Sequence, residues 1–592
     1  MAEYRNPHHE PGAEKRPLIA LLVAFVGIAL MQYFLPKPQP APQPQQQKQA
    51  EASPGQKPAT TTATAAPASP QKAPASAAVS PVAVKRAEAE AETVIDSPLY
   101  RIVLVNRGAM VKSWVLKNYK DGQGKPQEMV NATSVATVGS PLSLFTYDKD
   151  LQNKLNQALF VASTSDPITA PGSITFEFAD SETQARKTLR FDSTYVISLE
   201  VEVTHKGQKV QAYPIWHGGL GDQSTAASYG STKIDWQQDN NIEHKSAFSG
   251  FFLTGKKWVV GGQTLNGPFQ WAGVSDQYFV AAFLPESPRS TAIVTLHDQI
   301  DLPKNPSKPE DTEKIKVSVL GVAVGDTGGV TRERLFVGPK AVDILDGVQS
   351  QKNGPNLRGI LDFGIFGFIA RPLFLWLKWT HDHWIPNWGW AIAFLTVVIT
   401  AALLPLRITG MKSALKMQKL QPQIKAINEK YKRYSITDPR RAEMQKEMSA
   451  LYKREGVNPL GGCFPLLLQM PFLIAFYSML NNAIELRHAD WLWIHDLSSP
   501  DPLYILPIAI TITMFLTQKS TPQAGMDPAQ QKMLAFMSPL MMGYFSLLMP
   551  SGTGVYWGIS NIISYIQQIV INRSQFGQQV RKGVERRATR KR

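Results

Sequence analysis

The chain has 592 residues, and 62 Lys and Arg against 47 Asp and Glu give it a net charge of +15. A single cysteine excludes both an intrachain disulfide and a metal site built from several cysteines. The length predicts several domains. The basic residues lie beside long apolar runs, which favours a membrane protein with its positive charge inside over a protein that binds nucleic acid sequence-specifically.

The first elements are expected to be a membrane anchor and a tether. Residues 1–17 end in the basic pair Lys15 and Arg16, and the charge-free run at 18–35 follows directly. Since the end of that run lacks a small-x-small cleavage site, we expect an uncut first transmembrane helix with its N-terminus in the cytoplasm. Residues 36–92 are rich in Pro, Gln, Ala, Ser and Thr, which predicts a disordered linker outside the membrane.

Residues 93–340 show hydrophobicity of period two. From Ile197 to Thr204, for example, Ile, Leu and Val alternate with polar residues. Many such runs separated by Gly, Pro and Asn predict a large antiparallel β-sandwich outside the membrane. Within it, helices are expected only near 151–159 and 340–346.

Residues 359–383 are predicted to form an amphipathic helix lying on the outer membrane surface. At 100° per residue, Arg371, Lys378 and Asp382 share one face, and large apolar residues lie roughly opposite. Charged residues in the middle disfavour a full span, and nearby tryptophans suit the headgroup region.

Five further apolar runs predict transmembrane helices, so that the chain would have six spans with both termini in the cytoplasm. These runs are 388–408, 459–485, 503–518, 533–549 and 554–572. The last two form one charge-free stretch, which we expect to be divided by the turn-forming residues Pro550 to Gly554.

Basic segments are expected on the cytoplasmic side. Residues 409–458 hold 12 Lys and Arg against five acids, with helical hydrophobic spacing on either side of Asp438 and Pro439, which predicts a basic helical hairpin. Residues 573–592 predict a basic cytoplasmic tail.

Catalytic motifs are weak. The segment 250–256 has the spacing of a phosphate-binding loop, but Lys257 stands where Ser or Thr would hold magnesium. Ser413 and Lys416 match Ser-x-x-Lys without companion motifs, and His381 and His383 lack further metal ligands. We therefore expect no catalytic residue, metal or cofactor.

Polar side chains inside the apolar runs are the stronger signal. Thr396, Thr400 and Arg407 recur on one stripe of the second span. A stripe in the last span consists of Tyr556, Ser560, Ser564 and Gln567 or Gln568, and Gln469 lies in the third span. Such stripes either hold helices together or line a wet cleft for a polar substrate segment, and the spacing alone leaves both interpretations open.

Several motifs resemble one family closely. The stretches NPLGGCFPLLLQMP, ELRHADWLWIHDLSSPDPLYILP and DPAQQKM, with the later PSG-x-x-x-Y turn, are similar to the YidC membrane protein insertases of Gram-negative bacteria. The resemblance covers residues 359–592, whereas the N-terminal segments fit in order and size.

The resemblance implies an inner-membrane insertase and chaperone that works alone or with the Sec translocon, without nucleotide hydrolysis. It implies a periplasmic β-supersandwich, a five-helix insertase core and a cytoplasm-facing hydrophilic groove for nascent membrane proteins. From the polar stripes, we expect this groove to be lined by Thr396, Thr400, Gln469, Tyr556, Ser560 and Ser564, with Arg407 as the nearest cation.

The resemblance also implies further partners. A basic hairpin and tail would contact the ribosome and nascent chain, and anionic lipids would surround the protein. Within these basic segments, we expect the contact residues to be Lys425, Lys432, Arg433, Arg440, Arg441, Arg586 and Arg587.

One position departs from the family pattern. The family has a basic residue five positions before a Pro-Leu pair, but here Pro405 and Leu406 are preceded at that distance by Thr400. We therefore expect weak attraction for acidic client tails, with Arg407 as the nearest cation.

Two other functions are alternatives to an insertase. A small-solute transporter would need repeat-related broken spans, and none is evident. An envelope carbohydrate-binding protein would act through the β-rich segment alone.

Overall fold

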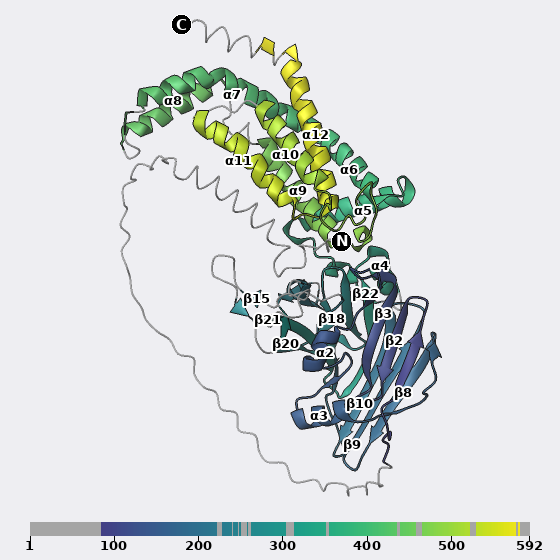
Figure 1. The fold of residues 1–592 in the computed structure, drawn as a ribbon. Coiled ribbons are helices and arrows are strands. Elements are labelled where there is room, and N and C mark those ends of the chain that lie inside the picture. Colours follow the sequence, from purple (N-terminus) through teal and green to yellow (C-terminus); the bar gives the residue numbers. More distant parts are fainter. Residues whose placement is uncertain are drawn as a thin grey trace, which may run out of the picture.

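The computed structural model describes a β-rich domain and a helical region that contact each other (Figure 1). The described residues are 84–221, 228–239, 241–246, 248–249, 257–258, 262–303, 313–350, 354–431, 433–434, 438–456, 464–520, 528–575 and 578–579. The predictions for 1–35, most of the linker, the 250–256 motif, Lys432, Arg586 and Arg587 lie outside these residues.

The β domain, residues 84–350, contains three larger sheets in its described part. The ten-stranded sheet consists of β14 (Asn241–Ser246), β13 (Lys233–Gln238), β18 (Phe269–Ser275), β19 (Phe279–Pro285), β22 (Val330–Pro339), β10 (Val196–His205), β9 (Thr183–Phe191), β8 (Gly172–Ala179) and β6 (Val161–Ala162), with β11 (Gln208–Lys209) pairing β10. One five-stranded sheet has the order β4 (Pro126–Glu128), β3 (Met110–Lys120), β2 (Tyr100–Val105), β1 (Glu92–Asp96) and β7 (Ile168–Thr169). The other has the order β17 (Thr264–Asn266), β20 (Thr291–Pro303), β21 (Lys314–Asp326), β12 (Tyr213–Trp216) and β5 (Leu144–Phe145), and β15 (Phe248–Ser249) pairs β16 (Lys257–Trp258).

The strand pairings are antiparallel except for β1 with β7, which run parallel over two residue pairs. The predicted alternation at Ile197–Thr204 falls in β10, whose inward residues are buried. Large aromatic rings fill the space between sheets. The ring centroid of Trp114 in β3 lies 5.9 Å from that of Trp216 in β12 and 6.0 Å from that of Tyr100 in β2. Burial of these rings stabilises the packing of one sheet on another.

Short helices of the β domain begin at capping side chains. Asn131 caps α2 (Ala132–Val138), which hydrophobic spacing does not reveal. Asp148 caps α3 (Lys149–Gln157), which therefore begins and ends two residues before the predicted 151–159. The third helix, α4 (Val342–Ser350), lies near the predicted 340–346.

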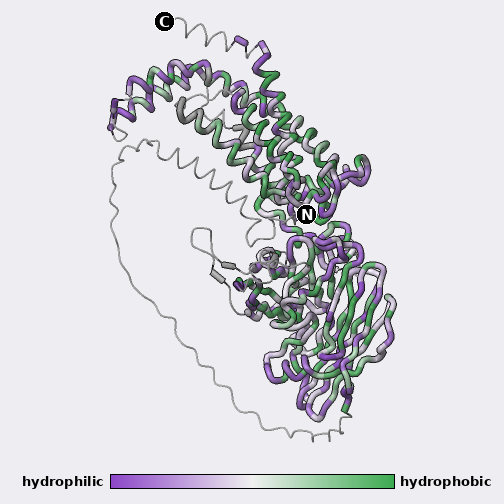
Figure 2. The backbone as a smooth tube through the Cα atoms, viewed as in Figure 1, coloured by the Kyte–Doolittle hydropathy of each residue, from purple (hydrophilic) through white to green (hydrophobic). Residues whose placement is uncertain are grey.

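The helical region carries an apolar bundle and a polar hairpin, α7 with α8 (Figure 2). Its helices are α5 (Gly367–His383), α6 (Trp388–Ala402), α7 (Leu404–Tyr431), α8 (Arg440–Arg454), α9 (Phe464–Asn482), α10 (Ile505–Ser520), α11 (Pro528–Ser546) and α12 (Ser551–Arg573). Single 3-10 turns occur as η2 (Ser228–Ser231), η3 (Pro288–Ser290), η4 (Leu357–Ile360), η5 (Gly364–Phe366) and η7 (Ile484–Leu486).

The predicted second span is not one straight helix. The chain bends by 56° between α6 and the first part of α7, at Leu403. Pro405 lacks the N–H that would continue the α6 hydrogen-bond pattern, which accounts for the break. Among the described helices, this bent pair passes a test of length and apolar composition for crossing a membrane, and no single helix does. The count of six spans stays a prediction.

The predicted turn at Pro550–Gly554 is wrong for four of its five residues. Pro550 precedes α12, and Ser551 to Gly554 form its first turn, where all four residues are buried. A Cβ on Gly552 would lie 3.2 Å from the Leu497 carbonyl oxygen, and one on Gly554 would lie 3.1 Å from Leu506. The two glycines therefore serve close helix packing, and tertiary contact overrides their turn preference.

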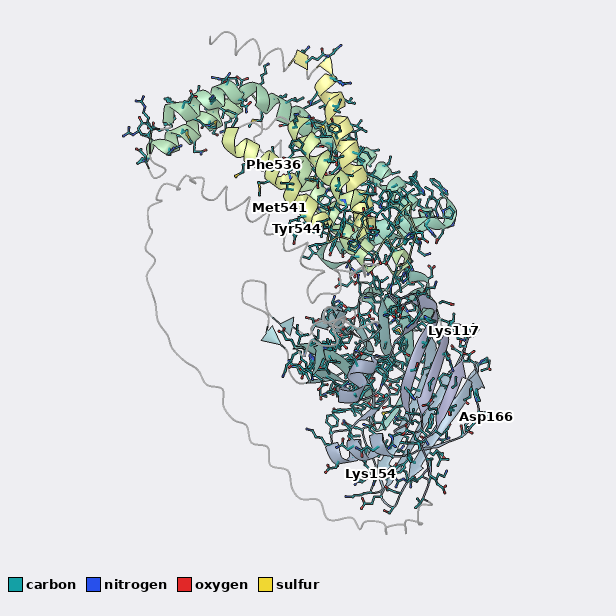
Figure 3. The ribbon with its side chains drawn as sticks, in the orientation of Figure 1. Lys117, Lys154, Asp166, Phe536, Met541 and Tyr544 are labelled. Carbon is teal, nitrogen blue, oxygen red and sulfur yellow. The ribbon has the colours of Figure 1, made fainter. Side chains whose placement is uncertain are left out.

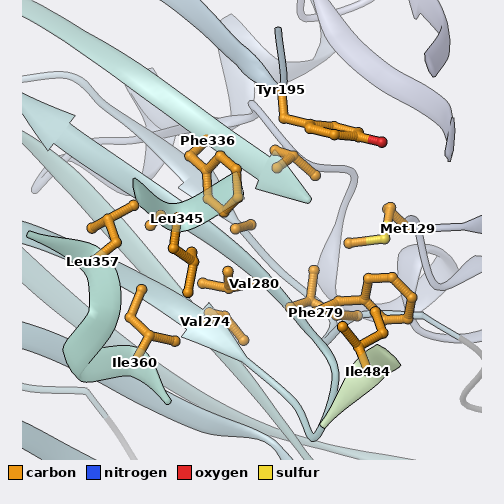
Figure 4. Close-up of a cluster of buried hydrophobic side chains, with 14 of the residues drawn as sticks. Met129, Tyr195, Val274, Phe279, Val280, Phe336, Leu345, Leu357, Ile360 and Ile484 are labelled. Carbon is orange, nitrogen blue, oxygen red and sulfur yellow. The ribbon is translucent and has the colours of Figure 1, made fainter. Parts of the chain in front are cut away.

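The β domain packs on one end of the bundle, which we call the proximal end. Ile484 of η7 joins the hydrophobic cluster that contains Phe279 and Met129 (Figure 4). The Gln277 side chain donates a hydrogen bond of 2.6 Å to the Asn481 carbonyl, and Lys378 of α5 pairs with Asp343 of α4 at 2.9 Å. The hairpin and the end of α12 lie at the opposite, distal end (Figure 1).

Glu333 of β22 is a buried carboxyl in the β domain. Neither of its oxygens has a hydrogen-bond partner among the described residues. Burial raises the pKa of the Glu333 carboxyl well above its ordinary value of 4.5. The folded domain therefore holds this proton more tightly than the unfolded chain.

From this we predict that Glu333→Gln stabilises the β domain at neutral pH. In the parent chain the free energy of unfolding should fall as pH rises above 4.5, because the unfolded chain releases the Glu333 proton first. The amide cannot ionise, so that fall should be smaller in the variant. Pulse proteolysis of the full-length chain in urea, across pH 5 to 8, measures the difference. Glu202→Gln, on the partly exposed side of β10, is the control, and equal pH profiles for parent and Glu333→Gln would refute the prediction.

Candidate functional site

Four elements of the bundle surround a group of polar side chains. Helix α12 contacts α6, α7 and α9, and α7 also contacts α9. The bend after α6 directs the start of α7 across the bundle, so that Arg407, in the first turn of α7, faces both neighbours.

Arg407 is the centre of this group. One terminal nitrogen, Nη1, donates to Ser564 Oγ at 2.7 Å. The other, Nη2, donates to Gln469 Oε1 at 3.2 Å and to Ser560 Oγ at 3.4 Å. Gln469 Nε2 in turn lies 3.4 Å from Ser560 Oγ. These four residues, which we call the arginine cluster, bring together α7, α9 and α12.

The cluster holds a buried positive charge. Arg407 is only 5% exposed, and its three recorded partners are two hydroxyls and an amide, none of them charged. Removing a cation from water is costly, and neutral partners offset that cost only in part. An incoming anion would therefore be stabilised at this position.

Three other predicted groove residues lie outside the cluster. Thr396 and Thr400 of α6 are 0% and 1% exposed, and the Thr396 hydroxyl donates to the Ile392 carbonyl of its own helix at 2.7 Å. Tyr556 is buried and stacks on Phe476 of α9, with ring centroids 3.9 Å apart. Tyr556 thus has the contact expected of a residue that holds two helices together, whereas the Thr396 hydroxyl is satisfied within its own helix.

Polar residues at the end of α9 bind the segment before α5. Ser478 Oγ donates to the Phe363 carbonyl at 2.8 Å. Asn482 Nδ2 donates to the Ser478 carbonyl at 2.8 Å and approaches the Asp362 carbonyl at 3.5 Å. These groups position the connection between the β domain and the bundle.

The sequence pattern does not single out Asn561 of α12 and does not decide between Gln567 and Gln568. Asn561 Nδ2 and Gln567 Oε1 are buried without a hydrogen-bond partner among the described residues. Toward the distal end, Gln568 Nε2 donates to Asn572 Oδ1 at 3.0 Å, and Asn572 Nδ2 to the Ser520 carbonyl at 2.9 Å. Counting amides along the last span would have shown this second polar run, since an apolar anchor has no use for them.

The basic hairpin has a small core of its own. Met417, Leu420, Ile424 and Leu451 pack between α7 and α8. The start of α8 matches the prediction, because Asp438 Oδ1 accepts the Arg440 N–H at 2.9 Å.

The predicted contact residues of the hairpin differ in how exposed their side chains are. Lys425, Arg433 and Arg440 are exposed. Arg441 is half-buried and donates to the Tyr434 carbonyl at 3.1 Å, so that it supports the turn between the helices.

The histidines of α5 serve packing. His381 stacks on Trp388 with centroids 3.8 Å apart, and its Nδ1 lies 2.9 Å from an Asp382 oxygen. Across the part of the chain that the structure describes, no three His, Cys, Asp or Glu side chains are grouped closely enough to hold a metal.

Comparison with known proteins gives consistent matches to both parts of the chain. The family described as 60Kd inner membrane protein matches residues 379–579, and the YidC periplasmic domain matches residues 92–376. A crystal structure of an active YidC insertase with its first transmembrane domain resolved aligns with 83% of this chain and 95% of that one, at 17% identity and a TM-score of 0.34.

Two curated relatives bear the same name, membrane protein insertase YidC. The protein from Syntrophus aciditrophicus is 32% identical over 519 residues, which cover 82% of this chain and 86% of the relative. The protein from Wolinella succinogenes is 44% identical over 240 residues, 40% of this chain and 42% of the relative. The chain therefore belongs to the YidC family of membrane protein insertases, inner-membrane proteins with a periplasmic domain.

Proposed function

We propose that the arginine cluster belongs to a hydrophilic groove that receives the polar part of a nascent membrane protein. The observation that carries this proposal is the buried Arg407 guanidinium, held by neutral side chains from α9 and α12. A polar client segment that enters such a groove exchanges water for hydroxyl, amide and guanidinium groups, and so avoids the cost of entering lipid unpaired. No covalent step or nucleotide hydrolysis is required.

Client helices would leave the groove sideways into lipid. Helices α10 and α11 present large exposed apolar side chains, among them Phe515, Phe536 and Tyr544; the last two are labelled on α11 in Figure 3. An apolar client segment loses little by moving from this surface to acyl chains, whereas its polar flank is held by the groove. The same proposal includes six spans with both termini in the cytoplasm, a five-helix insertase core and a β-supersandwich.

We further propose that Arg407 supplies the groove cation that the family pattern places at the position of Thr400. Thr400 is 1% exposed, so that a charge there would have to displace packed neighbours. Arg407 already reaches Ser560 and Ser564. This proposal replaces the expectation that acidic client tails are handled poorly.

Under this proposal, Arg407→Gln should reduce insertion of a client with an acidic translocated tail by about tenfold, because a hydrogen bond to a charged group contributes about 1.5–3 kcal/mol. A matched client with a neutral tail should be affected much less. Insertion into vesicles containing the purified chain, scored by protease protection of the tail, measures both.

Thr400→Arg is the matched control, and it should not improve insertion of the acidic-tailed client in the parent chain. Equal loss for acidic and neutral tails in Arg407→Gln would show that Arg407 only supports the bundle. A large gain from Thr400→Arg would restore the expectation drawn from the family pattern.

The basic hairpin is proposed to contact the ribosome and the emerging chain, with the tail residues Arg586 and Arg587 adding to the same contact. The exposed side chains of Lys425 and Arg433 support this proposal, as does their connection through α7 to the arginine cluster. The Sec translocon and anionic lipids are the further proposed partners. Exposed Trp376 and Trp379 of α5, and Trp384 directly after it, suit a membrane surface.

The combined change Lys425→Glu and Arg433→Glu should weaken co-sedimentation with ribosomes by about tenfold at low salt. Each contact between a basic side chain and an RNA phosphate releases counterions, which favours binding, and the double variant loses these contacts. Dependence on salt should become shallower. Lys125→Glu with Lys206→Glu alters the same net charge on exposed residues of the β domain and should have no effect. If both pairs of changes weaken ribosome binding equally, net charge rather than the hairpin is responsible.

A further inference from the structure

The loop between α9 and α10, residues 487–504, is unusually well buried for a connection. Trp491, Ile494, Leu497, Ser499 and Asp501 are each 8% exposed or less. Trp491 and Ile494 exchange backbone hydrogen bonds of 2.7 and 2.9 Å, which close a tight turn at the centre of the loop. The loop thus has a fixed conformation at the proximal end of the bundle.

This loop binds the first turn of α12. The Ser551 N–H and its hydroxyl both donate to the Ser499 carbonyl at 2.7 Å, and the Gly552 N–H donates to the Leu497 carbonyl at 2.8 Å. The loop carbonyls therefore satisfy N–H groups that a helix start leaves free. Helix α12 cannot move away from the loop without losing them.

The same loop binds the first turn of α6. Asn387 Nδ2 donates to the Asp490 carbonyl at 2.9 Å, and Trp491 packs edge-on against Trp390 with centroids 5.5 Å apart. A Cβ added to Gly389 would lie 2.1 Å from Trp491 Cγ. The indole therefore fills the space directly against the α6 backbone.

Asp501 fixes the loop to the start of α10. Its Oδ1 accepts from Trp493 Nε1 at 2.9 Å and from the Leu503 N–H at 3.0 Å, and its Oδ2 accepts from the Leu506 N–H at 2.7 Å. One buried carboxylate thus joins the tryptophan turn to the helix. Its hydrogen bonds to donors are the charge-assisted kind, which are stronger than neutral ones.

Mostly apolar side chains lie between this loop and the arginine cluster. Ile392, Leu480, Val555 and the stacked pair of Phe476 and Tyr556 are buried there. The cluster is therefore separated from the periplasmic side first by apolar side chains and then by the loop. The distal end differs, because its α12 residues Gln568 and Asn572 form a polar run.

We propose that the 487–504 loop is the permeability seal of the groove, with Asp501 and Trp491 as its positioning residues. This inference rests on the proposed groove. A groove that holds polar groups inside the membrane would conduct protons and small ions if it were open at both ends. By binding the starts of α6, α10 and α12 together, the loop keeps the periplasmic end closed while clients enter from the other side.

The test measures ion leakage without any client. The full-length chain is reconstituted in vesicles that contain a pH-sensitive dye, and proton entry is followed after a pH step. Asp501→Ala and Trp491→Ala should each raise the leak by about tenfold over the parent chain, because loss of a buried hydrogen bond or ring shifts the open population by about that factor.

Two variants serve as controls. His495→Ala removes a side chain on the same loop that is 86% exposed and should leak like the parent chain. Trp491→Phe retains an aromatic ring against Gly389 and should leak much less than Trp491→Ala. Gel filtration and thermal unfolding in detergent establish that each variant is folded. If Asp501→Ala fails to fold, Ser551→Ala, which loses only the hydroxyl bond to Ser499, replaces it with a smaller expected rise.

The outcomes separate the seal from the groove. The seal is overturned if both Trp491→Ala and Asp501→Ala, or its substitute Ser551→Ala, are folded and leak no more than the parent chain. That result would not contradict the proposed groove. Raised leakage with Trp491→Phe rescue supports the seal. A third outcome is that the loop variants leak, but that adding Arg407→Gln to them does not alter client insertion. The loop would then seal a pathway other than the proposed groove, and the inference would fail.

Discussion

A positive charge without a charged partner is the constraint on which the helical region depends. Burying the Arg407 guanidinium among uncharged groups is tolerable only if its N–H groups find acceptors, and Gln469, Ser560 and Ser564 provide them from two other helices. The spacing of α7, α9 and α12 is thereby tied to the reach of one side chain. A tighter bundle would have no room for the guanidinium, and a looser one would leave its donors unpaired.

The two ends of the bundle solve different physical problems. At the proximal end the backbone carbonyls of the 487–504 loop bind the start of α12, the Gln277 side chain of the β domain binds the end of α9, and apolar side chains such as Ile484 and Leu497 are buried. At the distal end, the buried Gln568 amide bonds Asn572 inside the bundle, and basic residues of the hairpin such as Lys425 are exposed. Under the proposed function, a client that approaches from the distal end would meet groups able to replace its water, whereas the proximal end is packed. The direction of entry would then follow from the distribution of polar groups along the bundle.

Periodicity predicted the parts of the structure that local sequence decides. The alternation in β10, the hairpin core of Ile424 and Leu451, and the helix start at Asp438 all follow from spacing or capping chemistry. The angular position of a residue around its helix does not predict which neighbour it contacts. Ser560 and Ser564 contact Arg407, whereas Tyr556, on the same stripe of α12, stacks on Phe476. That outcome depends on which neighbour lies opposite at each depth, and a helical wheel carries no information about depth. The helical first turn at Ser551–Gly554 was missed for a similar reason, since the turn preference of its glycines yields to contacts with Leu497 and Leu506 that are distant in sequence.

If Arg407 supplies the groove charge as proposed, a charge can keep its place in the bundle while its position in the sequence changes. Seven residues along a straight helix return to nearly the same azimuth, about 20° away, but with a rise of about 10 Å. Two features shorten that distance. Side chains on a helix lean toward its N-terminus, so that the long Arg407 side chain extends back toward the middle of the bundle. The 56° bend at Leu403 also turns the start of α7 across α12 instead of continuing away from it. Thr400 is then a small, buried residue of α6, and the proposed groove charge comes from Arg407 in the next helix.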